Sequence, residues 1–292
     1  MVGWVVIYLK NHWSDFVAIE AIVWPYVVLL LSASLIYIIV QGLVLKVTLK
    51  PFGIRLKFFE WFGITILTFL GNYIFPFSGF GFRAAYLKKR YGFSYASFVG
   101  SLAAIYLTEF FLFTLGGLIG LWGWYKATGF VDYKILTLFL AVFSFCAVFL
   151  FFSPRLPTFK NKSLIHLKNV LESLYLIKTN IPLMRQLLMI VTMEVLLFST
   201  IFFLAYRALN FPVSFPSSMI AAALSLYSLL IRVTPASFGF YEATVIYTTK
   251  LLSLTIANGL MVAMVTRVVN IVWVFALAPF FSYFLILRKT SK

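Results

Sequence analysis

Six charged residues lie within or beside the long apolar stretches of this chain, and their chemistry most needs an explanation. They are three arginines and three glutamates: Arg83, Glu109, Glu194, Arg232, Glu242 and Arg267. An ionised side chain at the centre of a bilayer costs about 2.5–3.5 kcal/mol on insertion scales, so each needs a partner or a purpose. Arginine binds phosphate through its two-pronged guanidinium group. The sequence therefore predicts a polar chamber in which the arginines receive an anionic headgroup.

The glutamates have two interpretations, which are compatible with each other. Glu109 and Glu242 would hold the arginines in place, and they could also bind a cationic headgroup. The alternative is purely structural, with ion pairs that hold two halves of the chain together; a substrate could still open such pairs by competing for the arginines. Glu194 is expected to be structural, or a proton carrier if transport is coupled to protons.

The composition determines the class of protein that must position these charges. Apolar residues make up 63% of the 292 residues, charged residues only 11%, and the mean hydropathy is +1.01. A soluble domain has about a quarter charged residues, so an ordinary soluble globule is excluded. Several apolar runs of about 20 residues are long enough to cross a bilayer as helices. We therefore expect an all-α polytopic membrane protein.

The sequence contains no motif typical of a metal-binding, cofactor-dependent or catalytic protein. Cys146 is the only cysteine, and the two histidines lie far apart. No metal-ligand spacing, nucleotide-binding loop or nucleophile motif is present, so we expect no cofactor, no metal and no enzyme activity. The net charge of +16 could suggest nucleic acid. In a membrane protein, however, basic residues mark cytoplasmic loops and the anionic lipid surface, so no nucleic-acid partner is expected.

Two stretches rich in helix breakers resemble each other and suggest an internal repeat. Each begins with a proline, has a serine two residues later, then glycine and aromatic residues, and carries a charge seven residues after the proline. That charge is Arg83 after Pro76 and Glu242 after Pro235. A long helix follows each stretch and carries the opposite charge, Glu109 or Arg267. We expect the glycines to permit tight turns; they are Gly79, Gly81 and Gly239.

The distribution of basic residues predicts the topology. Five long apolar runs are expected to span the membrane: 18–45, 94–122, 133–153, 185–209 and 257–287. If 58–91 and 217–251 are re-entrant hairpins, 16 of the 24 Lys and Arg residues fall on one side, which the positive-inside rule assigns to the cytoplasm. The N-terminus would then lie outside and the C-terminus in the cytoplasm.

The two halves would consequently be inverted repeats with broken helices, an arrangement found in many transporters. Within a single transmembrane domain, 1–292, the first repeat would cover 18–122 and the second 185–287. Between them, 133–153 would be a linking transmembrane helix. A cytoplasmic amphipathic segment would follow at 154–184, because leucines recur there at helical spacing with lysines between them.

At these two stretches the chain resembles the transmembrane region of the lysylphosphatidylglycerol synthase family, over roughly residues 15–288. The residues that resemble the first motif of the family are Asn72, Pro76, Gly79, Gly81, Arg83 and 86–89. Those that resemble its other motif are Pro235, Gly239, Glu242 and Arg267. Many members carry Glu directly after the first-motif glycine, where this chain has Phe82.

The resemblance implies lipid handling in the cell membrane of a bacterium or archaeon. In the best-known members this region is thought to flip aminoacylated phosphatidylglycerol between leaflets, and some free-standing members are associated with polyprenyl-lipid or glycolipid pathways. The first hypothesis is therefore a flippase or scramblase for an anionic, aminoacylated or glycosylated lipid. It would bind membrane lipids, as a homo-oligomer or beside a lipid-modifying enzyme.

Three further hypotheses remain open at the level of the sequence. The same repeat could carry a small soluble anion. Glu109 or Glu242 could act as acid or base in an intramembrane enzyme, although no catalytic motif supports this. The chain could also be a non-catalytic partner of a membrane glycosyltransferase.

Overall fold

A computed structural model describes residues 22–152, 162–228 and 234–287, and these residues form helices without any strand. The helices are α2 (Trp24–Thr48), η2 (Lys50–Phe52), α3 (Phe58–Ile74), α4 (Ser78–Tyr91), α5 (Tyr95–Thr128), α6 (Tyr133–Phe151), α7 (Lys162–Thr179), α8 (Ile181–Ala208), α9 (Phe215–Ser228), η3 (Pro235–Ser237), α10 (Phe240–Leu251), α11 (Ile256–Ser282) and the π-helical turn η4 (Tyr283–Leu287). Five of them, α2, α5, α6, α8 and α11, are long and apolar enough to cross a membrane. The all-α membrane class is therefore confirmed within the described residues, and these five helices are the candidate spans; residues 18–21 of the first predicted span lie outside the described residues.

Local sequence signals explain most helix boundaries. Ser94, Asp132 and Thr255 each accept a hydrogen bond from a backbone N–H of the first turn that follows. Gly92 and Gly129 end α4 and α5 in the left-handed conformation, which glycine adopts without steric cost. Because the stop signal for α5 is Gly129, this helix runs six residues past the predicted boundary at 122.

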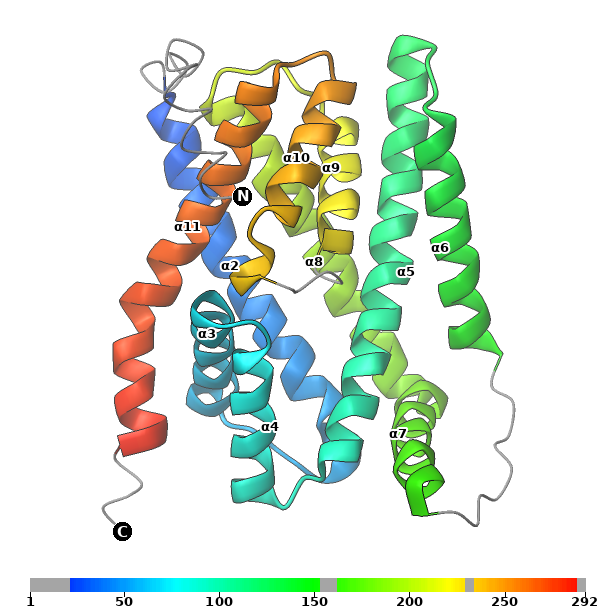
Figure 1. The fold of residues 1–292 in the computed structure, drawn as a ribbon, viewed down its shortest axis with the longest axis vertical. Helices are drawn as coiled ribbons and strands as arrows, with labels where there is room; N and C mark the ends of the chain where they lie inside the picture. Colours follow the sequence, from blue (N-terminus) through cyan, green and yellow to red (C-terminus); the bar gives the residue numbers. More distant parts are fainter. Residues whose placement is uncertain (1–21, 153–161, 229–233, 288–292) are drawn as a thin grey trace.

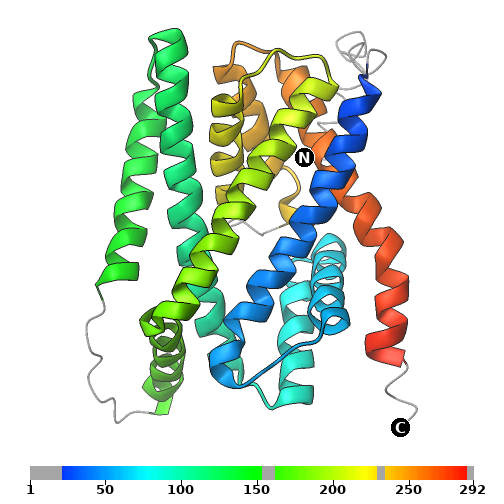
Figure 2. The same ribbon diagram turned by 180° about the vertical axis from the view of Figure 1, so that it is seen from behind.

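Two short helix pairs meet at the middle of the molecule (Figure 1). The pair α3 and α4 occupies the lower half, with its connection at mid-height, and the pair α9 and α10 occupies the upper half, with η3 at mid-height. The long helices α2, α5, α8 and α11 run past both pairs in the two views (Figures 1 and 2). A re-entrant path for each pair and an inverted repeat of the halves stay predictions.

The apolar core is divided into an upper and a lower part at the same height. In the upper core, the first half of α2 and of α11 packs with α8, α9 and the middle of α5. In the lower core, the second half of α2 and of α11 packs with α3 and α4. Both α2 and α11 change partner near their midpoints, between Tyr37 and Ile38 and between Val269 and Val274. Polar residues of the long helices are concentrated at this boundary.

Helix α7 packs against α5 and α8 of the bundle. Its Ile177 is fully buried in a cluster with Ile105 of α5 and Leu187 of α8. A cytoplasmic position for this segment remains a prediction. Lys178 donates hydrogen bonds to the carbonyl oxygens of Phe149 and Phe152, and so stabilises the C-terminal end of α6.

The ends of the bundle differ in charge. The C-terminal ends of α2 and α4, with their basic last turns, lie at the lower end together with α7 (Figure 1). The α5–α6 and α10–α11 connections lie at the upper end and carry few basic residues. Since α2 begins at the upper end and α11 ends at the lower one, the described chain crosses the bundle an odd number of times.

Candidate functional site: a polar cavity between two helix-pair tips

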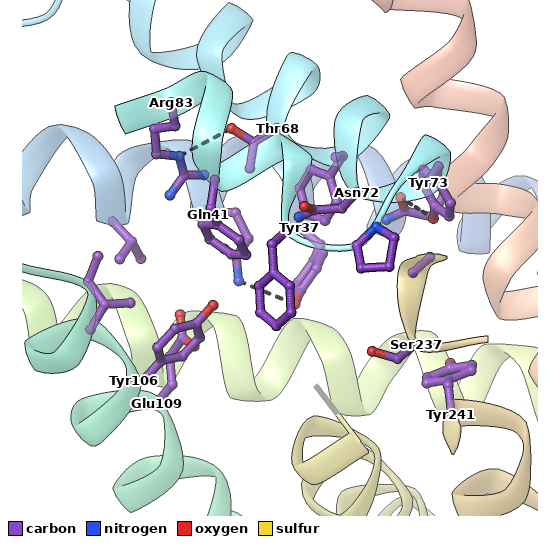
Figure 3. A pocket seen from close by; sticks show the side chains of 18 of the residues that line it. Tyr37, Gln41, Thr68, Asn72, Tyr73, Arg83, Tyr106, Glu109, Ser237 and Tyr241 are labelled. Atoms are coloured by element: carbon purple, nitrogen blue, oxygen red, sulfur yellow. Dashed lines mark hydrogen bonds between the residues drawn. The ribbon is translucent and has the colours of Figure 1, made fainter. Parts of the chain in front are cut away.

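A cavity of about 200 Å³ lies where the two cores meet. Charged side chains reach its wall from three helices: Arg83 of α4, Glu109 of α5 and Arg267 of α11. Amides join them from α2, α3 and α11: Gln41, Asn72 and Asn270. Figure 3 shows Arg83, Glu109 and Ser237 on different sides of one space. The structure therefore gathers residues that are far apart in sequence around a single cavity.

Arg83 faces the cavity from the second turn of α4. Its Nε donates a hydrogen bond to Thr68 Oγ1 at 3.2 Å, and its guanidinium carbon lies 5.6 Å from the centre of the Phe80 ring. The residue is buried in the protein. These two contacts orient the guanidinium group toward the cavity.

The tip between α3 and α4 is held by hydrogen bonds. Asn72 Oδ1 accepts from the backbone N–H of Gly79 at 3.1 Å, and Ser78 Oγ donates to the carbonyl oxygen of Gly71. Gly71 and Gly79 lie in backbone contact, and a methyl group on Gly79 would overlap the carbonyl oxygen of Thr68. Asn72 and Gly79 therefore shape the wall of the cavity.

The predicted role of the first-motif glycines in the turn is wrong. Gly79 and Gly81 lie within α4, and the left-handed residue of the turn is Phe77, with φ of 61°. Gly79 is needed for close packing instead, whereas a side chain on Gly81 would point into open space. In the second stretch the prediction is right, because Gly239 has φ of 91°.

The second tip has an irregular backbone. Ala236 and Ser237 have φ of 49° and 54°, and Gly239 also has a positive φ, of 91°. Left-handed conformations in residues other than glycine are uncommon and concentrate at functional sites. Ser237 is 1% exposed, lines the cavity and has no hydrogen-bond partner for its hydroxyl oxygen.

Arg267 is bound to this second tip by an ion pair. Its Nη2 lies 2.6 Å from Glu242 Oε1, and its Nη1 donates to the carbonyl oxygen of Ala236 at 3.2 Å. The rings of Phe238 and Tyr241 lie 5.1 and 5.2 Å from its guanidinium carbon. Glu242 also accepts from the backbone N–H of Gly239, at the start of α10. This ion pair lies within the second half of the chain; it does not link the two halves.

The buried carboxyl group of Glu194 lies behind the cavity wall. Glu194, on α8, is 0% exposed and accepts a hydrogen bond from the amide of Gln41, which lines the cavity. The same amide nitrogen lies 3.3 Å from the hydroxyl oxygen of Tyr37. A row of hydrogen-bonded polar side chains, Glu194, Gln41 and Tyr37, therefore connects α8 to the cavity through α2.

Several site residues escaped the sequence analysis. Asn270 accepts a hydrogen bond from Tyr73 at 3.0 Å and links α11 to α3. It follows Thr266 and Arg267 at helical spacing on an otherwise apolar helix, and this polar stripe was a usable signal. Gln41 and Thr68 gave no such signal because their partners are distant in sequence.

Of the other predicted residues, Pro76 lines the cavity, and Pro235 begins η3 beside it. Arg232 lies outside the described residues. Among the described residues, no group of three His, Cys, Asp or Glu side chains could hold a metal ion.

Comparison with known proteins identifies the family. No curated protein and no solved structure is significantly similar to the chain. A protein family described as the lysylphosphatidylglycerol synthase TM region matches residues 2–278, nearly the whole chain. The chain therefore belongs to the lysylphosphatidylglycerol synthase TM region family.

Proposed function

We propose that this protein moves a lipid with an anionic headgroup between the two leaflets of a bacterial or archaeal cell membrane, as a flippase or scramblase. The observation that carries the proposal is the cavity itself. It places Arg83 and Arg267 together with amide and hydroxyl groups at the middle of a bundle of apolar helices. Headgroup phosphate would bind to arginine, while amides and hydroxyls would bind an aminoacyl, sugar or glycerol group.

The rim of the cavity favours a lipid over a small soluble anion. Phe77 lines the cavity and is more than half exposed, as are Ile74 and Phe75 beside it. This rim lies at mid-height of the molecule, where the tip of α3 and α4 is found (Figure 1). Apolar side chains at that depth would contact acyl chains, so a headgroup could enter the cavity while its tails stay in the hydrocarbon.

The proposal includes an orientation. The lower end of the bundle, which carries the basic ends of α2 and α4, would face the cytoplasm, and the upper end would face outward. The pairs α3–α4 and α9–α10 would then be re-entrant from opposite sides, with the cavity between their tips near the bilayer midplane.

Translocation in proteoliposomes tests this function. Labelled anionic, zwitterionic and glycosylated lipids are compared with uptake of a soluble anion such as phosphate, for wild type, Arg83→Gln and Lys89→Gln. Lys89 is exposed on the same helix as Arg83 but outside the cavity, so its variant is the matched control. We expect the protein to accelerate anionic lipids most and Arg83→Gln alone to lose this activity. Uptake of phosphate without lipid movement would contradict the proposal and favour a carrier.

A further inference from the structure

The carboxyl group of Glu194 is the most deeply buried ionisable group at the site, and the proposed function makes no use of it. It lies in the middle of α8, with none of its surface exposed. Within the described residues, no lysine or arginine forms an ion pair with it. An ionised carboxylate in such a position, without a cation, is far more costly than a neutral one.

The hydrogen bonds of Glu194 suit a neutral acid. The side-chain amide of Gln41 donates to Oε1, whereas Oε2 is buried without a hydrogen-bond partner. A carboxylate would hold a full charge against neutral donors only, the amide of Gln41 and the hydroxyl group of Tyr37. A protonated acid leaves only a hydroxyl group unpaired, which is a smaller penalty.

The neighbours of Glu194 connect it to the cavity. From α2 it faces Gln41 and Tyr37, and from α5 it interacts electrostatically with Glu109, which lines the cavity. From α7, α9 and α11, the other helices packed against α8, no titratable side chain of the described residues interacts with it. The charge on Glu194 therefore acts on Glu109 and on the hydroxyl group of Tyr37.

We propose that Glu194 is an exchangeable proton-binding site that sets the charge of the cavity. When Glu194 is protonated, Glu109 is the single negative carboxylate of the pair. When the O–H bond of Glu194 breaks, the proton passes to the Glu109 carboxylate, so the pair keeps one proton and one charge. Loss of that proton to one side of the membrane and its recovery from the other would couple lipid movement to a proton gradient.

The site itself is tested without any transport assay, by infrared spectroscopy of the purified protein at neutral pH. The chain has only eight Asp and Glu residues, so the spectral region of protonated carboxylic acids is sparsely populated. Glu194→Gln keeps an acceptor for the Gln41 amide and is expected to fold. We expect a band of a protonated carboxylic acid in wild type and in the exposed control Glu172→Gln, and its loss in Glu194→Gln. An identical band in Glu194→Gln, or none in wild type, would overturn the proposal.

The coupling rests on the proposed lipid transport and is tested separately. A gradient of one pH unit corresponds to a factor of about ten for each proton moved. In proteoliposomes, we expect this gradient to shift the leaflet distribution of an anionic lipid by up to about tenfold in wild type and in Glu172→Gln, and to cause no shift in Glu194→Gln. Translocation without any shift would overturn the coupling and leave the transport function standing. Infrared bands as expected, with no translocation, would support the proton site and contradict the transport function.

Discussion

The two tips that enclose the cavity have similar sequences and different electrostatics. At the first tip, the first turn of α4 contains no acidic residue. At the second tip, Glu242 lies in the first turn of α10 and neutralises Arg267. The N-terminal end of α10 is therefore already stabilised by a carboxylate, whereas that of α4 is not.

Under the proposed lipid transport, this difference would give the two tips different tasks. The first tip, where the first turn of α4 contains no acidic residue, would suit an anionic group. The second is a preformed, charge-neutral platform with an unpartnered serine hydroxyl, which suits a polar but uncharged part of a headgroup. The two tips would thus contribute complementary chemistry to one binding site.

Removal of the carboxylate at the second tip should have the largest effect on stability. Glu242→Gln leaves Arg267 buried without its anion, and breaking a buried pair in this way typically costs 3–5 kcal/mol. We expect a loss of about 4 kcal/mol in the free energy of unfolding, measured by denaturation in detergent.

Two controls complete that experiment. The double variant with Arg267→Gln should be less destabilised than Glu242→Gln alone, because no unpaired charge remains. Glu172→Gln, at the exposed pair with Lys168, should change stability by less than about 0.5 kcal/mol. Equal losses for Glu242→Gln and Glu172→Gln would contradict the assignment of a buried pair.

The glycines of the first tip provide the next largest contrast. Gly79→Ala would force the added methyl group against the carbonyl oxygen of Thr68, and we expect a loss of about 3 kcal/mol, at the upper end for overpacking. Gly81→Ala would enter open space within a helix and should be neutral or stabilise the protein by up to about 1 kcal/mol. Thermal unfolding of both variants measures the contrast, and similar behaviour would show that the two helices do not pack as described.

The serines at matching positions in the two tips should respond differently. Ser78→Ala loses hydrogen bonds to the carbonyl oxygens of Gly71 and Phe75 and should cost about 1 kcal/mol. Ser237→Ala removes a hydroxyl group that has no partner and should leave stability unchanged or slightly higher. Unfolding measurements on the two variants, made in parallel, decide this; a larger loss for Ser237→Ala would mean that its hydroxyl group is bound in the resting protein.

The smallest effect is expected at Glu60, in the first turn of α3 and outside the membrane spans. Burial alone would raise the pKa of Glu60, but hydrogen bonds from Tyr91, Lys57 and Arg90 and the charge of Arg90 lower it overall. A lowered pKa in the folded state gives stability that is present above the unfolded pKa, about 4.3, and lost as pH falls through the folded value.

We therefore expect Glu60→Gln to cost about 1 kcal/mol at neutral pH and less at acid pH. Unfolding measured at both pH values tests this, with Lys89→Gln as the control. A loss for Glu60→Gln that does not depend on pH would rule out an ionised Glu60.

Much of the fold was accessible from the sequence, because apolar runs and their interruptions are local signals. The five spans and the short helices followed from them.

The cavity residues fall into two groups. Arg83, Glu109 and Arg267 were found because a charge in an apolar helix is conspicuous. Gln41 and Thr68 were missed because a single polar residue on a helix can be recognised as part of a site only when its partner on another helix is known. The pairing of Arg267 with Glu242 likewise required the tertiary structure.

Reversible blocking of the cavity tests whether lipid passes through it. In a Cys146→Ala background, Ser237→Cys places one thiol at the cavity wall, and Glu172→Cys places one on an exposed surface. A bulky disulfide-forming reagent, with labelling confirmed by mass, should stop translocation of anionic lipid in Ser237→Cys, and reduction should restore it. The labelled Glu172→Cys protein should remain active. Unchanged translocation by the labelled Ser237→Cys protein would show that lipid does not pass through the cavity.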